Sequence, residues 1–221
     1  MDKPEPITPI HDAPTPAIIP VRLLEHGVLP SYATLLAAGC DLTATADIDI
    51  RPGETRLLPL GFIMALPSDC EAQIRPRSGL SLKTMLRLPN APGTIDADYR
   101  HEVGVILENT FNPAALPGLI AANPALLEQL RTQYRLVRMA DLLPLSSPDR
   151  PSQGNALLAD YLKQTVWVDE AGRPYGTIRI QRGDRIAQMV IQTIRRAVFD
   201  PLTDPADTGH DRGGGFGSTG G

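Results

Sequence analysis

Cysteine and histidine are scarce in this sequence, and their scarcity excludes several kinds of site. Among 221 residues there are two cysteines, Cys40 and Cys70, which are too few for a disulfide framework or a thiolate metal site. The four histidines show none of the spacings typical of metal ligands. We therefore predict that both cysteines are buried and behave as small apolar side chains.

Long apolar runs and an excess of positive charge are also absent. No apolar stretch reaches the length of a membrane span and the N-terminus lacks a signal-peptide pattern, so we expect a cytoplasmic protein that does not bind membranes. The net charge is −4 and the isoelectric point about 5.6, which argues against non-specific binding of nucleic acid. A polyphosphate ligand would have to be met by clustered arginines, glycine-loop amides and a metal ion.

The residues that are present predict an all-β fold. A hydrophobic fraction of 42% supports a packed core in one domain, which leaves room for a long insertion. Short segments of strand-like composition are separated by turns rich in proline and glycine, a pattern that indicates a β-barrel or jelly roll. The predicted strands include residues 18–23, 47–50, 55–60, 61–65, 177–180 and 186–194.

The two ends of the chain differ from the middle in composition. Residues 1–17 contain five prolines and are predicted to form a disordered arm. Residues 18–199 form the β domain, and residues 200–221, rich in glycine, are predicted to be a flexible tail.

Residues 110–175 interrupt the β pattern as an insertion. Asn123 and Pro124 are typical of the N-cap and first residue of a helix, which the apolar spacing carries to about Leu142. A weaker helix is predicted over residues 156–163 and a strand over residues 165–168. Two interpretations stay open: the insertion covers apolar surface, or it binds a protein partner or covers the active site.

Residues 92–109 are the segment around which the rest is organised. Their local pattern predicts a β-hairpin, with a turn at residues 96–99 and apolar residues alternating on the outgoing strand. Asp96 and Tyr99 then lie at the mouth of the hairpin, where free backbone groups can bind the edge of a flat ring. A plain hairpin with solvated acids is the alternative, because aspartate is a common turn residue.

Four further segments accompany this one in a fixed order along the chain. They are Ala38–Leu42, Arg77–Leu80, Arg182–Gln188 and the glycine-rich Arg212–Gly220, while residues 93–99 of the segment itself form a Gly-x-Ile-Asp-x-x-Tyr core. In this order the five segments closely resemble those of the trimeric dUTPases, over roughly residues 18–109 and 176–220. The resemblance implies a distorted jelly-roll β-barrel with a partly helical insertion. It also implies hydrolysis of dUTP to dUMP and pyrophosphate, which keeps uracil out of DNA and supplies dUMP for thymidylate synthesis.

The resemblance assigns roles at the nucleoside end of the site. Asp96 is expected to hold and deprotonate the attacking water, since a carboxylate is ionised at neutral pH. Tyr99 is expected to pack on the deoxyribose and leave no room for a ribose hydroxyl. Uracil is expected to bind backbone groups around Thr94, Ile95 and Gly104, with Asn90 as a further contact. Asp98 has no counterpart in the family motif.

Other residues are expected to bind the phosphates. Arg77 would donate a planar fork to phosphate oxygens, Ser78 would hydrogen-bond the bridging oxygen of the leaving group, and Gly79 would permit close backbone approach. Gln188 matches the glutamine that contacts the α-phosphate or the water. Asp184 and Arg185 are expected to form a structural pair.

The tail and a metal ion complete the implied site. Arg212 is expected to clamp the γ-phosphate, Phe216 to stack on uracil, and Gly217 and Ser218 to cradle phosphate oxygens. The tail would close as a lid over the site of a neighbouring subunit in a homotrimer with shared active sites. Mg²⁺ is the implied cofactor, with Asp41 reaching it through water.

Two departures from the family pattern leave rival functions open. His101 stands where the family usually has glycine, and the insertion replaces a short loop. A dCTP deaminase of the same fold is one alternative, although such an enzyme would use a glutamate near the base. A non-hydrolytic nucleotide-sensing regulator that binds partners through residues 110–175 is the other.

Overall fold

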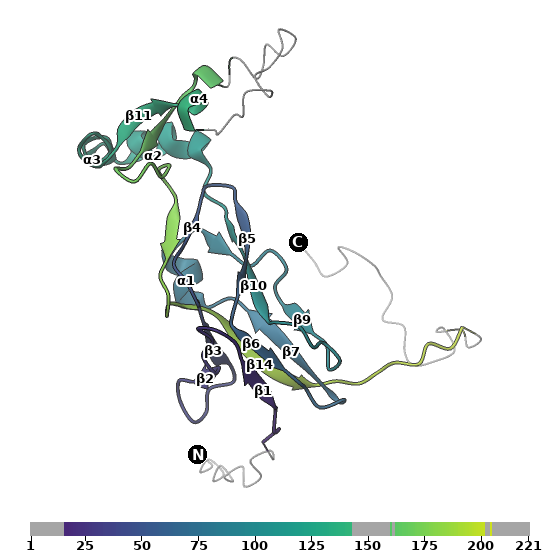
Figure 1. The fold of residues 1–221 in the computed structure, drawn as a ribbon. Coiled ribbons are helices and arrows are strands. Elements are labelled where there is room, and N and C mark those ends of the chain that lie inside the picture. The colour runs from purple at the N-terminus through teal and green to yellow at the C-terminus, as the bar shows by residue number, and fades with distance from the viewer. Residues whose placement is uncertain (1–15, 143–159, 161, 202–203, 205–221) are drawn as a thin grey trace, which may run out of the picture.

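The computed structural model describes residues 16–142, 160, 162–201 and 204, and nearly all of the regular structure outside the insertion is antiparallel β-strand (Figure 1). The largest sheet has five strands in the order β2-β3-β14-β7-β9. Their bounds are Ser31–Tyr32, Cys40–Thr43, Arg185–Thr193, Cys70–Arg75 and Gly93–Ile95, respectively. The longest of them, β14, lies at the centre because both of its edges are paired, with β3 on one side and β7 on the other.

Three smaller sheets close the β domain. Strands β5 (Thr55–Pro59), β10 (Gly104–Asn109) and β8 (Leu86–Arg87) form one of them. Strand β1 (Val21–Leu23) pairs with β6 (Phe62–Met64), and β13 (Ile178–Ile180) pairs with β4 (Ile48–Ile50). The pairing of β13 with β4 brings the chain back to the β domain after the insertion.

Alternation of apolar residues builds the core between these sheets. In β7 the buried residues are Cys70, Ala72 and Ile74, and in β10 Val105 and Leu107 are buried while their neighbours are not. Successive side chains of a strand point to opposite faces, so each strand contributes one apolar row to the core. The prediction of an all-β jelly roll is confirmed, and Cys40 and Cys70 are both buried free thiols as expected.

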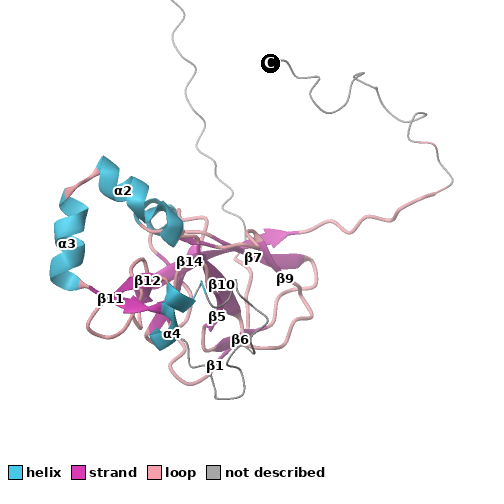
Figure 2. Cartoon of the chain, turned by 90° about the horizontal axis from the view of Figure 1, so that it is seen from above, coloured by secondary structure: helices cyan, strands magenta, loops and turns pink. Residues whose placement is uncertain are grey.

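The insertion forms a separate group of elements at one end of the molecule (Figures 1 and 2). It contains η1 (Pro113–Ala115), α2 (Leu116–Ala122), α3 (Ala125–Gln133), β11 (Arg135–Arg138), α4 (Met139–Leu142) and β12 (Thr165–Val168). The predicted strand over residues 165–168 is confirmed. Most of the weaker helix predicted over residues 156–163 lies outside the described residues.

The helix predicted from Asn123 to about Leu142 is wrong in its second half. Helix α3 ends at Gln133, because residues 135–138 pair as strand β11 with β12. Asn123 is the C-cap of α2, and the residue before α3 is Pro124, which makes no side-chain cap. The spacing of Leu127 and Leu130 predicted α3 correctly, but a partner strand some 30 residues further along the chain overrode the helical pattern at Val137.

The hairpin predicted for residues 92–109 is also corrected. Strand β9 pairs with β7, whereas β10 pairs with β5 and β8, so the two strands of the expected hairpin belong to different sheets. The turn between them is present, with the Tyr99 N–H donating to the Asp96 carbonyl at 3.2 Å. Since β9 and β10 do not pair with each other, they leave a space between their edges.

After β14 the described chain runs away from the sheets as an extended arm (Figure 1). Val198 and Phe199 on this arm are almost fully exposed. Among the described residues, no helix has both the length and the apolar character that a membrane span requires.

Candidate active site

A cavity of about 220 Å³ occupies the space between β9 and β10. Six residues predicted for the nucleoside end of the site line it together, namely Asn90, Thr94, Ile95, Asp96, Tyr99 and Gly104. The strand divergence that contradicts a simple hairpin is therefore what creates the predicted binding space.

The walls of this cavity carry unpaired backbone edges. Strand β9 is the last strand of its sheet, so its edge away from β7 is free of a strand partner. Strand β10 pairs with β5 from Gly104 to Glu108, but with β8 only at Glu108 and Asn109. Free N–H and C=O groups on a strand edge bind a planar donor–acceptor edge as they would bind another strand.

Tyr99 lies at the mouth of the cavity and is held by its neighbours in the turn. Its side-chain hydroxyl donates to the Glu102 carbonyl at 3.0 Å, and its ring meets the His101 ring edge-to-face at 5.7 Å between centroids. The Glu102 carboxylate in turn accepts from the Gly61 N–H at 2.8 Å. With 39% of its surface exposed, Tyr99 is available to a ligand rather than enclosed in the core.

A second group of predicted residues gathers around Asp41 on β3. Arg77 Nε donates to Asp41 Oδ1 at 2.9 Å, and Arg185 Nη1 donates to Asp41 Oδ2 at 3.1 Å. Gln188 on β14 is the cross-strand neighbour of Asp41, so both side chains lie on the same face of the sheet. The buried carboxylate fixes two guanidinium groups beside Gln188, which makes an anion-binding surface.

The expected pairing of Asp184 with Arg185 is wrong. The Asp184 carboxylate accepts from the Gln181 N–H at 2.8 Å within its own turn, and Arg185 crosses to Asp41 on β3. Sequence adjacency suggested the pair, but consecutive residues at a strand start point in opposite directions. The long-range partner was missed because only the β3–β14 register brings it near.

Ser78 and Gly79 open the short helix α1 (Ser78–Lys83), which follows directly after Arg77. Both residues are exposed, and a methyl group added at Gly79 would meet no atom within 4 Å. The fold of the chain itself therefore does not require a glycine at this position.

The cavity residues around Asp96 and the arginine group around Asp41 lie at opposite ends of the β7–β9 pair. Ile95 is opposite Ala72, so Asp96 comes level with Glu71, while Arg77 follows the other end of β7. Six residues of extended chain separate residues 71 and 77, a distance of about 20 Å. Within one chain, Asp96 is too far away to orient a water onto a phosphate held by Arg77, because that role needs hydrogen-bond reach.

Another hollow, of about 540 Å³, lies where the insertion meets the β domain, and it contains none of the predicted site residues. Phe111, Tyr134 and Tyr175 line it, with Tyr175 meeting the other two rings edge-to-face at 5.6 and 5.3 Å. The sequence gave no indication of this cluster, because its three members lie up to 64 positions apart along the chain.

The remaining predicted contacts, Arg212, Phe216, Gly217 and Ser218, lie outside the described residues. Within the part of the chain that is described, no three histidine, cysteine, aspartate or glutamate side chains are grouped closely enough to hold a metal ion.

Part of the chain matches a known protein family. Residues 25–114, which hold the β3, Arg77 and β9–β10 segments described above, match the family model of the dUTPases. Over these residues the chain is similar to the dUTPases.

Solved dUTPase structures share the fold. A dUTPase from Staphylococcus bacteriophage 80alpha, crystallised as a mutant with dUpNHpp, is 21% identical, with a TM-score of 0.62 over 92% of this chain and 98% of the phage chain. A dUTPase from phage phi11 of S. aureus, described with a species-specific insert, is 21% identical, with a TM-score of 0.57 over 85% and 97%.

A mutant of the phi11 enzyme, described with a structural Mg(II) ion, gives a TM-score of 0.56 at 21% identity over 85% of this chain and 97% of that one. These similarities establish the dUTPase fold over most of the chain, including part of the insertion.

Proposed function

We propose that this enzyme converts dUTP to dUMP and pyrophosphate by attack of water on the α-phosphorus, with Asp96 holding and deprotonating that water. The observation that carries the proposal is the common cavity of Asp96, Tyr99 and the open edges of β9 and β10. A carboxylate at the mouth of a nucleoside-sized space is positioned to act on the first phosphate outside it.

Uracil would bind the backbone groups of β9 and β10, and Tyr99 would pack on the deoxyribose. Uracil presents alternating acceptors and a donor along one edge, which a strand-like wall around Thr94, Ile95 and Gly104 can match. Cytosine would place an amino group against a backbone N–H and leave both donors unpaired, which is costly in a closed site.

The phosphates would bind the arginine pair around Asp41. Arg77 and Arg185 have their guanidinium groups oriented by a carboxylate whose side chain is only 8% exposed, so little side-chain entropy remains to be lost on binding. Ser78 and Gly79 follow Arg77, and the open space around Gly79 suits close approach of a phosphate or of a neighbouring chain.

Mg²⁺ fits these residues as an ion carried mainly by the substrate. Both Asp41 oxygens already accept from a guanidinium, which leaves lone pairs for water but no multidentate protein cage. Mg²⁺ prefers waters and phosphate oxygens with few carboxylates, so Asp41 would reach it through water. When bound, the ion would neutralise charge on the phosphates.

We further propose that a complete site needs more than one copy of the chain, in a homotrimer. The separation of about 20 Å between Asp96 and Arg77 along β7 supports this, since both must act on one triphosphate. The exposed arm with Val198 and Phe199 suits contact with another subunit. The tail beyond it, with Arg212 and Phe216, would close over the site of a neighbour. In the cell, the reaction would keep uracil out of DNA and supply dUMP.

The base assignment is tested with Asp96→Asn. We expect pyrophosphate release from dUTP to fall by about 10²–10⁴-fold while dUTP binding, measured by calorimetry, is retained. Asp98→Asn, two residues away on the same exposed turn, is the matched control and should keep full turnover. Normal turnover by Asp96→Asn would remove Asp96 from the mechanism.

The shared site has a separate test by complementation. Asp96→Asn chains and Arg77→Ala chains should each be inactive alone. After mixed refolding, part of the activity should return, because some sites then combine an intact Asp96 with an intact Arg77. Failure of the mixture to recover activity, with both variants folded and assembled, would rule out a site shared in this way.

A nucleotide panel separates the rival functions. Release of ammonia from dCTP would support the deaminase alternative, and binding of dUTP without pyrophosphate release would support the regulator. A protein partner for residues 110–175 stays a prediction.

A further inference from the structure

The inference concerns His101, which no step of the proposed reaction uses. Its imidazole ring lies beside the Tyr99 ring, with centroids 5.7 Å apart and planes at 69°. Both side chains are exposed, and Tyr99 lines the nucleoside cavity. An edge-to-face pair of this geometry is more favourable than the buried area alone would give.

The other contact of the Tyr99 side chain leaves one degree of freedom open. Its hydroxyl donates to the Glu102 carbonyl at 3.0 Å, and Glu102 is anchored through its carboxylate to the Gly61 N–H. The hydroxyl oxygen lies on the axis about which a tyrosine ring rotates. The hydrogen bond therefore fixes where the ring is, but does not fix the plane in which it lies.

A lateral contact is needed to fix that plane, since the rotation about the Cβ–Cγ bond of tyrosine has broad, shallow preferences. His101 supplies such a contact from the side, two residues along the same turn. The backbone bond from the Tyr99 N–H to the Asp96 carbonyl orients the turn but does not touch the ring.

We propose that His101 is a specificity-determining positioning residue, which holds the plane of the Tyr99 ring against the sugar and so excludes a 2′-hydroxyl. Packing alone rejects an added hydroxyl poorly unless the wall is rigid, because a ring that can turn makes room for it. The inference rests on the proposed function, in which Tyr99 packs on deoxyribose.

The test compares kcat/KM for dUTP with that for UTP in the full-length enzyme. If UTP turnover is too slow to measure, its inhibition constant against dUTP replaces it. His101→Ala should lower the preference for dUTP by about 2- to 10-fold, mainly by improving UTP, as expected for loss of one aromatic pair. His101→Phe keeps an aromatic edge and should retain most of the preference. Asp98→Asn, on the same turn, is the control.

A second variant tests whether the Tyr99 hydroxyl bond and the His101 ring contact restrain the Tyr99 ring separately. Tyr99→Phe removes the hydroxyl anchor and leaves the ring held from the side by His101. His101→Ala should then cost more selectivity in the Tyr99→Phe background than in the parent, because the ring has lost both restraints.

The inference is overturned if His101→Ala leaves the dUTP-to-UTP ratio unchanged while dUTP is still hydrolysed. It is also overturned if His101→Ala weakens both nucleotides equally and His101→Phe restores neither, which would indicate a merely structural role. Absence of dUTP hydrolysis in the parent enzyme would instead remove the proposed function, so the two failures are distinguishable.

Discussion

The β domain and the insertion are stabilised in different ways. The core cluster of 21 buried residues lies entirely in the β domain. Among the described residues of the insertion, only Leu130 and Val168 are buried. Hydrophobic burial dominates folding stability, so the β domain has its own source of stability and the insertion has little beyond local contacts. The comparison indicates that the insertion can vary or open without loss of the catalytic fold.

Polar and aromatic contacts join the two regions. Asn109, fully buried, donates through Nδ2 to the carbonyls of Ile50 at 2.9 Å and Gly176 at 2.8 Å, and its Oδ1 accepts from the Phe111 N–H at 3.0 Å. These hydrogen bonds link the start of the insertion at Phe111, the end of the insertion at Gly176 and the β domain at Ile50.

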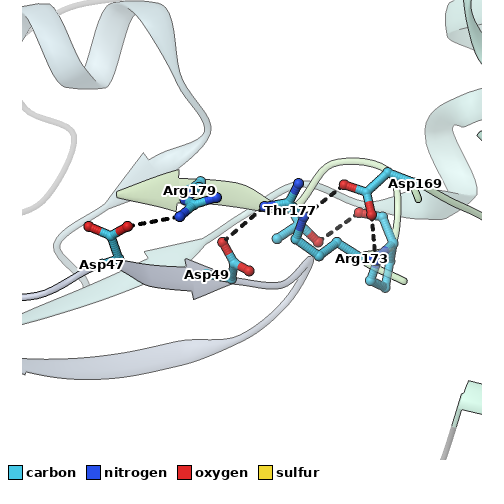
Figure 3. A network of polar contacts seen from close by, with 7 residues as sticks. Asp47, Asp49, Asp169, Arg173, Thr177 and Arg179 are labelled. Atoms are coloured by element: carbon cyan, nitrogen blue, oxygen red, sulfur yellow. Dashed lines mark hydrogen bonds and ion pairs between the residues drawn. The ribbon is translucent and has the colours of Figure 1, made fainter. Parts of the chain in front are cut away.

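A chain of ion pairs lies along the same boundary (Figure 3). Arg173 bonds Asp169 at 2.7 Å within the insertion and lies 3.7 Å from Asp49 on β4, and Arg179 bonds Asp47 at 2.8 Å.

The largest effect is expected from truncation of a buried leucine in each region. Leu107→Ala in β10 should destabilise the β domain by about 2–5 kcal/mol, because it leaves a cavity in the main core. Leu130→Ala in α3 should loosen the insertion alone. The single tryptophan, Trp167, lies in β12, so its fluorescence reports on the insertion, while hydrogen exchange of the β7 and β14 amides follows the β domain.

In denaturant, Leu107→Ala should lower the midpoint of the hydrogen-exchange transition of β7 and β14, and Leu130→Ala should lower only the midpoint of the fluorescence transition, with dUTP turnover retained. Coincident transitions in both variants would mean that the two regions unfold as one cooperative unit, and the contrast would fail.

Asn109→Ala should have the next largest effect, about 2–4 kcal/mol on both transitions, because it leaves buried backbone groups without partners. Asn112→Ala is the matched control. Asn112 is exposed and caps η1 through one bond to the Ala114 N–H, so its loss should cost about 1 kcal/mol. Equal effects of the two substitutions would show that Asn109 does not act as the joint.

Gly176→Ala should destabilise the joint by about 1–3 kcal/mol, through strain at a φ of +88° together with a clash between the new methyl group and the Phe111 ring. Gly172→Ala isolates the strain, because Gly172 has a φ of +78° and no atom within 4 Å of the added methyl. The denaturation midpoint followed by Trp167 fluorescence should therefore fall further in Gly176→Ala than in Gly172→Ala. A larger shift in Gly172→Ala would contradict the clash.

The smallest effect is expected at the ion pairs. Although burial opposes it, hydrogen bonds from the Arg173 amide and guanidinium keep the pKa of Asp169 below its usual value. A carboxyl group whose pKa is lowered by folding stabilises the folded state at pH values above its unfolded pKa of about 4. This stabilisation is lost as the pH falls through the folded-state pKa.

Asp169→Asn should therefore flatten the acid dependence of the Trp167 transition below about pH 4 and change little at neutral pH. Asp141→Asn, in an exposed ion pair with Arg138, is the control for loss of a surface charge. An unchanged acid dependence in Asp169→Asn would assign the titration to other carboxylates.

Local patterns predicted much of the fold and part of the site. Strands β5 and β6 were predicted from the sequence within one or two positions of their bounds. The six predicted residues that line one cavity were named from the resemblance to the dUTPases. Where prediction failed, at Arg135–Arg138, a distant strand imposed its register on a sequence that by itself favours helix.

The sequence by itself determined the all-β core and the resemblance to the dUTPases, because alternation and motif spacing are properties of neighbouring residues. Only the tertiary structure decided that β9 and β10 diverge into separate sheets, that Arg185 crosses to Asp41, and that Asp96 and Arg77 lie at opposite ends of β7. These facts depend on which strands pair and in which register, and pairing is settled by packing across the whole domain.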